Sequence, residues 1–394
     1  MAGFFDGPPL PPDPPTELGR LRILSKTAGI RVSPLALGGG NIGQAWNANW
    51  GRMDKERAFA LLDAYVEAGG NFIDTANTYQ DGESEVWLGE WMAERNVRDR
   101  LVIATKYTSD WGLYDFANPG VQKGQTANHG GNSRRSLHMS LRESLRRLRT
   151  DWTASIEEVV DSLHALVQQG KVLYLGVSNT PAWVVSAANT YARAHGKTPF
   201  SVYSGKWNVL VRDLEREIIP MARAFGMAIA PWGVLGSGKF QTSEEVAERA
   251  RAGDTLRQSG GGREVEMSDA LAKVAAEHGT TSVVSIALAY VLRKEALLGV
   301  HNVFPVVGGR KTEQLQDNIA ALGIWLTEDQ VAYLEGVRAF EVGSPCGAIG
   351  DDPNATGVVG IMSSNSADLV FPGATEMILA VVSVCFGRRD FPAS

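Results

Sequence analysis

Short apolar runs alternate with longer segments of helical spacing along most of this chain. Strand-like runs lie at residues 35–37, 72–73, 101–105, 171–177, 200–203, 227–230 and 303–307. Segments with apolar residues three and four positions apart lie at residues 53–67, 84–94, 133–149, 267–278, 282–293 and 327–337. Strands that alternate with helices form parallel sheets, and two apolar runs about a turn at residues 20–32 predict a preceding hairpin. The pattern therefore predicts an α/β protein.

Polar side chains stand at the ends of two consecutive predicted strands. Asp74 ends one strand, Tyr79 follows it by five residues, and Lys106 ends the next strand. Because the carboxyl ends of neighbouring parallel strands lie side by side, we expect these three side chains to meet. Active sites of α/β proteins are built at this edge, so the three residues are candidate catalytic residues.

An acid, a phenol and an amine at one place suit proton transfer. A free phenol titrates near ~10 and is a poor proton donor at neutral pH. We expect the Lys106 ammonium to lower the pKa of Tyr79, and Asp74 to hold the lysine charged and in place. Tyr79 would then protonate a carbonyl oxygen while hydride reaches its carbon. The alternative is a structural ion pair between Asp74 and Lys106 beside an exposed Tyr79.

Three stretches of sequence resemble the aldo-keto reductase superfamily, and most closely its fungal aryl-alcohol dehydrogenase and norsolorinic acid reductase-like branch. They are GGNFIDTANTYQDGESEVWLGEWM at 69–92, SVYSGKWN at 201–208 and APWGVLGSGKF at 230–240. The resemblance implies a (β/α)8 TIM-type barrel with an N-terminal hairpin, the cofactor NADP(H), and reduction of an aromatic aldehyde or aryl ketone. Polyketide or mycotoxin biosynthesis is the expected setting. It also implies catalytic roles for Asp74, Tyr79, Lys106 and a histidine.

The strand that carries the family's histidine has no counterpart here. The chain passes from Thr150 through Trp152 directly into Thr153, which resembles the start of the following helix. About a dozen residues, a strand with its loop, are missing by typical lengths. The six histidines present lie elsewhere, at positions 129, 138, 164, 195, 278 and 301. We therefore expect a barrel without its fourth strand, and an alternative function as a catalytically impaired nucleotide-binding relative or the product of a truncated gene model.

The resemblance also implies a set of cofactor-binding residues. Ser178 and Asn179 would bind the nicotinamide carboxamide, and Trp232 would stack on its ring. The remaining expected residues are Gly233, Leu235, Gly236, Gly238 and Lys239 at the pyrophosphate and Gly308, Arg310, Gln314 and Asn318 at the adenosine end. A cationic Arg310 at a helix start suits a 2′-phosphate and favours NADP over NAD. Ser204 departs from the pattern, because relatives commonly have Gln there.

Two loops of the predicted barrel mouth need separate interpretation. Residues 38–43 satisfy G-x-G-x-x-G after a strand, but residues 44–50 lack a helix start, so a dinucleotide-binding fold is rejected. The Gly- and Asn-rich segment 110–132 contains Trp111, Tyr114 and Phe116. These aromatic residues either line a pocket for a flat substrate or pack the loop onto the barrel.

Composition limits the remaining possibilities. The net charge of −6 gives no electrostatic reason to expect nucleic acid or anionic membrane as a partner. Two cysteines in 394 residues cannot build a disulfide framework, and no signal pattern is visible, so a cytoplasmic location is expected. We expect no metal site. We predict a Pro-rich disordered arm at 1–19, the barrel at 20–340 and an irregular tail at 341–394, with the oligomeric state open.

Overall fold

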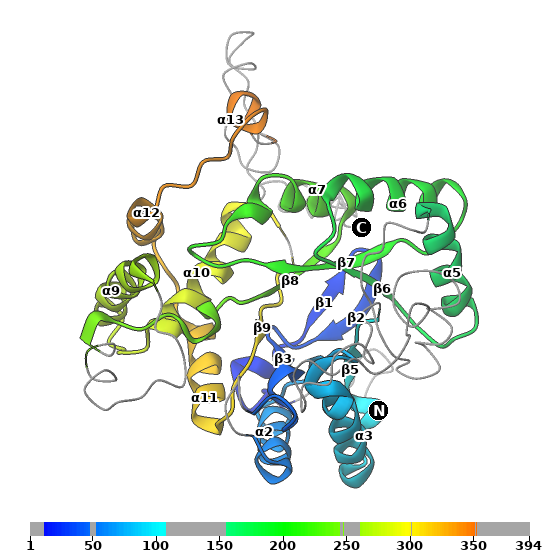
Figure 1. Cartoon of the computed structure of the whole chain (residues 1–394), viewed down its shortest axis with the longest axis horizontal. Helices are drawn as coiled ribbons and strands as arrows, with labels where there is room; N and C mark the ends of the chain where they lie inside the picture. The colour runs from blue at the N-terminus through cyan, green and yellow to red at the C-terminus, as the bar shows by residue number, and fades with distance from the viewer. Residues whose placement is uncertain are drawn as a thin grey trace, which may run out of the picture.

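The computed structural model describes residues 12–47, 53–107, 155–244, 247, 261–300, 302–350 and 352. Its strands are β1 (Arg22–Ser25), β2 (Ala28–Val32), β3 (Ala36–Gly38), β4 (Phe72–Asp74), β5 (Val102–Ala104), β6 (Leu175–Ser178), β7 (Phe200–Lys206), β8 (Ala228–Trp232) and β9 (Val306–Val307). Its α-helices are α2 (Lys55–Glu67), α3 (Glu83–Arg95), α5 (Ile156–Gln168), α6 (Ala182–Ala194), α7 (Ile218–Phe225), α9 (Gly262–Glu277), α10 (Val283–Leu297), α11 (Thr312–Ala320), α12 (Glu328–Val337) and α13 (Cys346–Ile349). Strands lie at the centre and helices outside them (Figure 1).

The central strands follow the order expected of a parallel barrel. One sheet has the order β5-β4-β3-β9 and the other β6-β7-β8, with all of these neighbours parallel. A parallel bridge between Ile229 and Val303 joins the two sheets, and the Phe304 amide donates to the Ile229 carbonyl at 2.8 Å. The strands therefore run in chain order around the molecule, with β9 next to β3.

The predicted absence of a fourth barrel strand concerns the gap between β5 and β6. Among the described residues no strand pairs with the outer edge of either β5 or β6. Residues 108–154, which include the predicted helix at 133–149 and the aromatic segment 110–132, lie outside the described part of the chain. The absence of the strand stays a prediction from the sequence.

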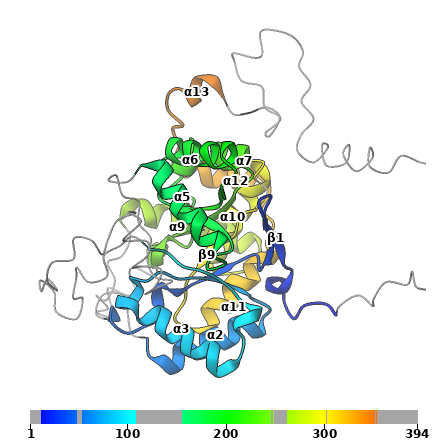
Figure 2. The ribbon, with the colours of Figure 1, turned by 90° about the vertical axis from the view of Figure 1, so that its right-hand side faces the viewer.

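The N-terminal caps and the buried faces of the helices agree with the spacing of polar and apolar residues in the sequence. Asp54 caps α2 by accepting from the Arg57 amide at 3.0 Å, and Ser155 caps α5 by accepting from the Glu158 amide at 3.1 Å. Such caps satisfy backbone donors that a helix start leaves unpaired. Helix α2 buries Ala58, Leu61, Leu62 and Tyr65 against the strands. Helices α2 and α3 cover one side of the strands, and α6 and α7 cover the opposite side (Figures 1 and 2).

The ends of the described chain attach to the barrel. Leu18, in the 3-10 helix Glu17–Gly19, is fully buried, and the Thr16 hydroxyl donates to the Ala68 carbonyl at 2.7 Å. Ordered structure thus begins inside the predicted N-terminal arm. Beyond α12, Arg216 donates to the carbonyls of Glu341 and Val342 at 2.8 and 3.1 Å. No described helix has the length and apolar content needed to cross a membrane.

Candidate active site

The structure brings the three predicted catalytic residues together. Asp74 ends β4, and Lys106 follows the end of β5 by two residues; Asp74 pairs in register with Ala104. The Lys106 ammonium lies 2.5 Å from Asp74 Oδ1, 2.9 Å from the Thr75 carbonyl oxygen and 3.3 Å from the Tyr79 hydroxyl. Asp74 is 8% exposed. One lysine therefore links the acid and the phenol at the carboxyl edge of the sheet.

A tight turn delivers Tyr79 to the lysine. The Tyr79 amide donates to the Ala76 carbonyl at 3.1 Å, and Gln80 and Asp81 then adopt left-handed φ angles of 54° and 56°. Such angles are costly for residues other than glycine and persist where surrounding contacts enforce them. Here the Gln80 side chain is buried, donates to the Gly40 carbonyl at 2.8 Å and accepts from the Trp46 amide at 2.8 Å.

The loop after β3 forms the wall beside Tyr79. The Trp46 ring meets the Tyr79 ring edge-on, with centroids 6.3 Å apart. The Trp46 indole nitrogen donates to Asp81 at 3.0 Å. Gly43 makes this approach feasible: its φ is +134°, and a Cβ there would lie 2.3 Å from the Gln80 Cβ. The sequence placed this loop at the barrel mouth but did not predict that Trp46 and Gln80 fix Tyr79.

The electrostatic expectation for Tyr79 needs correction. Burial raises the pKa of the Tyr79 phenol; the Lys106 charge acts to lower it, and the net pKa is raised. The sequence argument was right about the effect of Lys106 but wrong about the net direction, because it left out desolvation. For Lys106, burial acts to lower the pKa, but Asp74 and Tyr79 outweigh it and the pKa is raised. The free protein therefore holds a neutral phenol against a charged lysine.

Two buried polar atoms next to this triad lack hydrogen-bond partners in the described structure. They are Asn77 Nδ2, in the turn between Asp74 and Tyr79, and the Tyr107 hydroxyl, directly after Lys106. Asn77 is 1% exposed and Tyr107 is 7% exposed. Buried polar groups are normally paired, so each such group needs an explanation. Tyr107 follows β5, the strand whose outer neighbour is predicted to be missing.

The described histidines are engaged elsewhere. His164 Nδ1 lies 3.0 Å from the Thr198 hydroxyl, and His195 Nδ1 lies 3.0 Å from the Tyr191 carbonyl oxygen. His278 Nε2 lies 3.1 Å from Gln330 Oε1. His164 thus joins α5 to the segment before β7, His278 joins the end of α9 to α12, and His195 caps its own helix α6. His129, His138 and His301 lie outside the described residues. Within the described chain, no group of three or more His, Cys, Asp or Glu could hold a metal ion.

The predicted nicotinamide residues Ser178, Asn179 and Trp232 lie at the ends of β6 and β8, on either side of β7. Ser178 ends β6 and is paired in register with Ser204, and the Asn179 amide donates to the Ser204 carbonyl at 3.0 Å. Asn179 has a left-handed φ of 50°. Trp232 ends β8 opposite Lys206, is 37% exposed, and has the Lys206 ammonium 5.9 Å from its ring centroid. An exposed flat ring at a strand end fits a stacking surface for a nicotinamide.

The loop after β8 has the geometry of an anion-binding turn. Gly233, Gly236, Ser237 and Gly238 all have left-handed φ angles, between 55° and 80°. A Cβ at Gly236 would lie 2.7 Å from the Phe240 ring, so the backbone there lies against an aromatic side chain. Successive backbone N–H groups in such a turn can form a concave surface that suits phosphate oxygens. Leu235 is partly buried and Lys239 is exposed. These residues fit a pyrophosphate.

The predicted adenosine-end residues form a less uniform group. Gly308 is exposed after β9, and α11 begins at Thr312. The Gln314 side chain accepts from the Arg310 amide at 2.8 Å, so it orders the turn that presents Arg310. Asn318 is only 2% exposed. Of the predicted four residues, Gly308 is the exposed one, whereas the Gln314 side chain is bonded to the Arg310 amide and Asn318 is buried.

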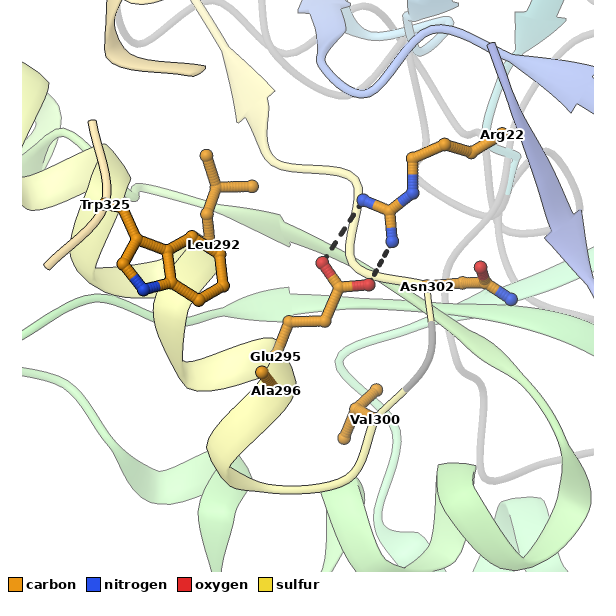
Figure 3. A pocket seen from close by; sticks show the side chains of 7 residues that line it. All are labelled: Arg22, Leu292, Glu295, Ala296, Val300, Asn302 and Trp325. Atoms are coloured by element: carbon orange, nitrogen blue, oxygen red, sulfur yellow. Dashed lines mark hydrogen bonds and ion pairs between the residues drawn. The ribbon is translucent and has the colours of Figure 1, made fainter. Parts of the chain in front are cut away.

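A described cavity of about 380 Å³ lies away from this site. It is lined by Arg22, Leu292, Glu295, Ala296, Val300, Asn302 and Trp325. Arg22 and Glu295 pair inside it, as Figure 3 shows. Arg22 belongs to the hairpin, and Val300 and Asn302 precede β9, so the cavity lies at the opposite end of the barrel from Asp74. Its ion pair fastens the hairpin to α10.

Comparison with known proteins identifies the family. The aldo/keto reductase family model matches residues 34–339, so the chain belongs to that family, whose fold is a (β/α)8 barrel. A Saccharomyces cerevisiae protein that carries the name aryl-alcohol dehydrogenase AAD14 is 59% identical over 376 residues, covering 91% of this chain and 97% of its own. The aldo-keto reductase ausK of Aspergillus calidoustus is 53% identical over 382 residues, covering 93% and 94%.

Another relative is named for its cofactor. The aryl-alcohol dehydrogenase [NADP(+)] of Phanerodontia chrysosporium is 48% identical over 359 residues, covering 86% of this chain and 91% of its own. The resemblance to the fungal aryl-alcohol dehydrogenase branch is thereby confirmed.

The aligned lengths bear on the missing strand. The alignment with the yeast relative has 376 positions. It covers 91% of this 394-residue chain, which is fewer than 376 residues. The same holds for the ausK alignment, with 382 positions and 93% of the chain. Both relatives therefore contain residues inside the aligned region that this chain lacks. The deletion predicted between Trp152 and Thr153 would account for such residues, and its position stays a prediction from the sequence.

Proposed function

We propose that this protein catalyses NADPH-dependent reduction of an aromatic aldehyde or aryl ketone to the alcohol. The observation that carries the proposal is the Lys106 ammonium held between Asp74 and Tyr79. NADPH, when bound, supplies the hydride that reaches the carbonyl carbon. The Tyr79 hydroxyl donates its proton to the carbonyl oxygen, and the resulting phenolate is stabilised by the Lys106 ammonium. Asp74 keeps that lysine charged and oriented.

The proposed cofactor site follows the strand ends and the turn before α11. Ser178 and Asn179 would bind the carboxamide, Trp232 would carry the nicotinamide ring, and the loop from Gly233 to Lys239 would receive the pyrophosphate. Gly308, Arg310, Gln314 and Asn318 would form the adenosine end. The supports are the exposed Trp232 ring and the left-handed glycines. The NADP-specific name of one relative supports the choice of cofactor.

The substrate class rests on the relatives. Names of aryl-alcohol dehydrogenases, and of a norsolorinic acid reductase from Aspergillus flavus that is 44% identical over 356 residues, indicate aromatic carbonyl compounds. The proposal includes a role in fungal secondary metabolism and a cytosolic site of action. The Trp46 ring beside Tyr79 supplies an aromatic wall for such a substrate.

A second candidate is a nucleotide-binding protein without catalysis. It is favoured by the predicted deletion of the segment that would carry the family's histidine, and by the Tyr107 hydroxyl after β5, which has no hydrogen-bond partner among the described residues. Loss of one donor to a developing oxyanion costs about 10²–10³ in rate. Both candidate functions predict NADPH binding, but only the reductase predicts turnover of the substrate.

Titration of the purified protein with NADPH by fluorescence, followed by turnover of an aryl aldehyde such as veratraldehyde, tests the proposal. Binding together with turnover that Tyr79→Phe abolishes supports the reductase. Binding without turnover supports the second candidate. Absence of binding in folded protein contradicts both.

A further inference from the structure

Asn208 connects the ends of two strands without facing the solvent. It follows β7 by two residues and is 3% exposed. Its Oδ1 accepts from the amides of Leu210 and Val211 at 2.9 and 2.8 Å, which closes a turn in its own loop. Its Nδ2 donates to the carbonyl of Gly233 at 2.9 Å, in the loop after β8. A carboxamide carries its acceptor and its donor on two separate atoms, so one short side chain reaches both loops.

The carbonyl to which Asn208 donates belongs to Gly233, the first residue of the Gly-rich loop 233–238. Gly233 directly follows Trp232, has a left-handed φ of 69°, and accepts a second bond from the Gly236 amide at 3.0 Å. The backbone bond from the Trp207 amide to the Trp232 carbonyl, at 3.2 Å, lies next to it. The Asn208 amide thus fixes the Gly233–Val234 peptide, one residue beyond the exposed Trp232 ring, and the Trp207 amide holds the preceding peptide.

We propose that Asn208 is a positioning residue of the cofactor site. It holds Gly233 so that the Trp232 ring and the backbone of residues 233–238 present one preorganised surface to the nicotinamide and pyrophosphate. The inference rests on the proposed function, because it takes this surface to be the NADPH site. Asn208 contacts neither ring nor phosphate; it acts through Gly233. Preorganisation lowers the ordering cost that a ligand must otherwise meet on binding.

Asn208→Asp is the sharpest variant. The introduced carboxyl is nearly isosteric and keeps the oxygen that accepts from Leu210 and Val211, but as a carboxylate it cannot donate to Gly233. A carboxylate oxygen and the Gly233 carbonyl oxygen would then face each other in a buried position, and their repulsion would displace the loop 233–238. We expect NADPH affinity to fall about tenfold or more, because one buried hydrogen bond is lost and two buried oxygens repel each other.

A matched control lies at the other end of the same strand. Asn189, in α6, is 1% exposed; its Oδ1 accepts from the Phe200 amide at 2.8 Å and its Nδ2 lies 3.4 Å from the Phe200 carbonyl oxygen. Asn189→Asp makes the same chemical change between a helix and the first residue of β7. We expect it to lower Tm as Asn208→Asp does, while NADPH affinity stays within about twofold of the unmodified protein.

Acid pH supplies a readout that a merely structural role would not move. When the introduced carboxyl is protonated, it can again donate a hydrogen bond to the Gly233 carbonyl. NADPH affinity of Asn208→Asp should therefore recover toward that of the unmodified protein as the pH falls and this carboxyl becomes protonated, relative to Asn189→Asp at the same pH. Recovery supports positioning through this one hydrogen bond.

Amide hydrogen exchange without cofactor separates this inference from the proposed function. If Asn208 holds the loop, exchange of residues 233–238 is faster in Asn208→Asp than in Asn189→Asp, whether or not NADPH binds. Unmodified protein that fails to bind NADPH contradicts the proposed function. Unchanged NADPH affinity and unchanged loop exchange in folded Asn208→Asp overturn the positioning role. Should that variant not fold, Asn208→Ser, which is too short to reach Gly233, gives the same comparison.

Discussion

The ammonium nitrogen of Lys106 lies 3.3 Å from the hydroxyl oxygen of Tyr79. The same ammonium group also donates to the Asp74 carboxylate. Lys106 belongs to the end of β5, whereas Tyr79 comes from the turn after β4. Their contact therefore depends on strand register and on the turn. It is the relationship on which proton transfer by this protein depends.

The titration of Tyr79 in the free protein tests this contact. Its pKa is raised by burial, with Lys106 opposing the rise. The phenol should stay protonated through neutral pH and ionise only above its ordinary value of about 10. Lys106→Met removes the opposing charge and should move the ionisation to still higher pH. The difference in ultraviolet absorbance titration between the unmodified protein and Tyr79→Phe isolates this one phenol; an inflection below about 9 would contradict the assignment.

Replacement of Gly43 should misplace Tyr79 without touching it. Gly43→Ala puts a Cβ 2.3 Å from the Gln80 Cβ at a φ of +134°, so the turn that carries Tyr79 must shift. A shift of about 1 Å in a reacting group costs about 10² in rate, so kcat should fall by about that factor. Gly89→Ala is the control, because that helical glycine has no atom near the new Cβ. It should add about 0.5–1 kcal/mol of stability and leave kcat unchanged.

A buried ion network between α10, α12 and the loop after β7 should govern stability and not chemistry. The Lys294 ammonium lies 3.3 Å from Glu215 and 2.9 Å from Glu335, and Arg212 also pairs with both acids. Lys294→Met leaves buried carboxylates short of positive charge, so the free energy of unfolding should fall by about 3 kcal/mol.

Urea unfolding measures this cost against Arg57→Met, which breaks a pair whose side chains are 63% and 45% exposed. That control should cost less than about 1 kcal/mol. Equal losses in the two variants would show that the Lys294 network is no more stabilising than a surface pair. The Tyr79 ionisation should be unchanged in both.

Restoring the missing segment should raise the rate. A chimaera that carries, between Trp152 and Thr153, the histidine-bearing strand and loop that the family resemblance implies would supply a second donor to the carbonyl oxygen. We expect kcat to increase by about 10²–10³, with little change in NADPH affinity. The same insert with its histidine changed to Ala separates the donor from the strand. No gain from the histidine-bearing insert would show that the deletion leaves the chemistry intact.

The sequence predicted what depends on strand ends and missed what depends on packing. Asp74 and Lys106 could be placed together because parallel strands present their carboxyl ends at one edge, and α2 and α3 could be predicted from apolar spacing. The raised pKa of Tyr79 could not, because the degree of burial is set by residues distant in sequence such as Trp46. Asn208 was overlooked for the same reason: its role depends on Gly233, which is adjacent in space and remote along the chain.

The most direct test of the central claim is turnover of an aryl aldehyde with NADPH by the unmodified protein and by Tyr79→Phe, with NADPH affinity measured for both. We predict that the phenylalanine variant binds NADPH as the unmodified protein does and reduces the aldehyde about 10²–10⁴ times more slowly. Equal turnover by the two proteins would contradict the assignment of Tyr79 as the acid, and with it the account of the site.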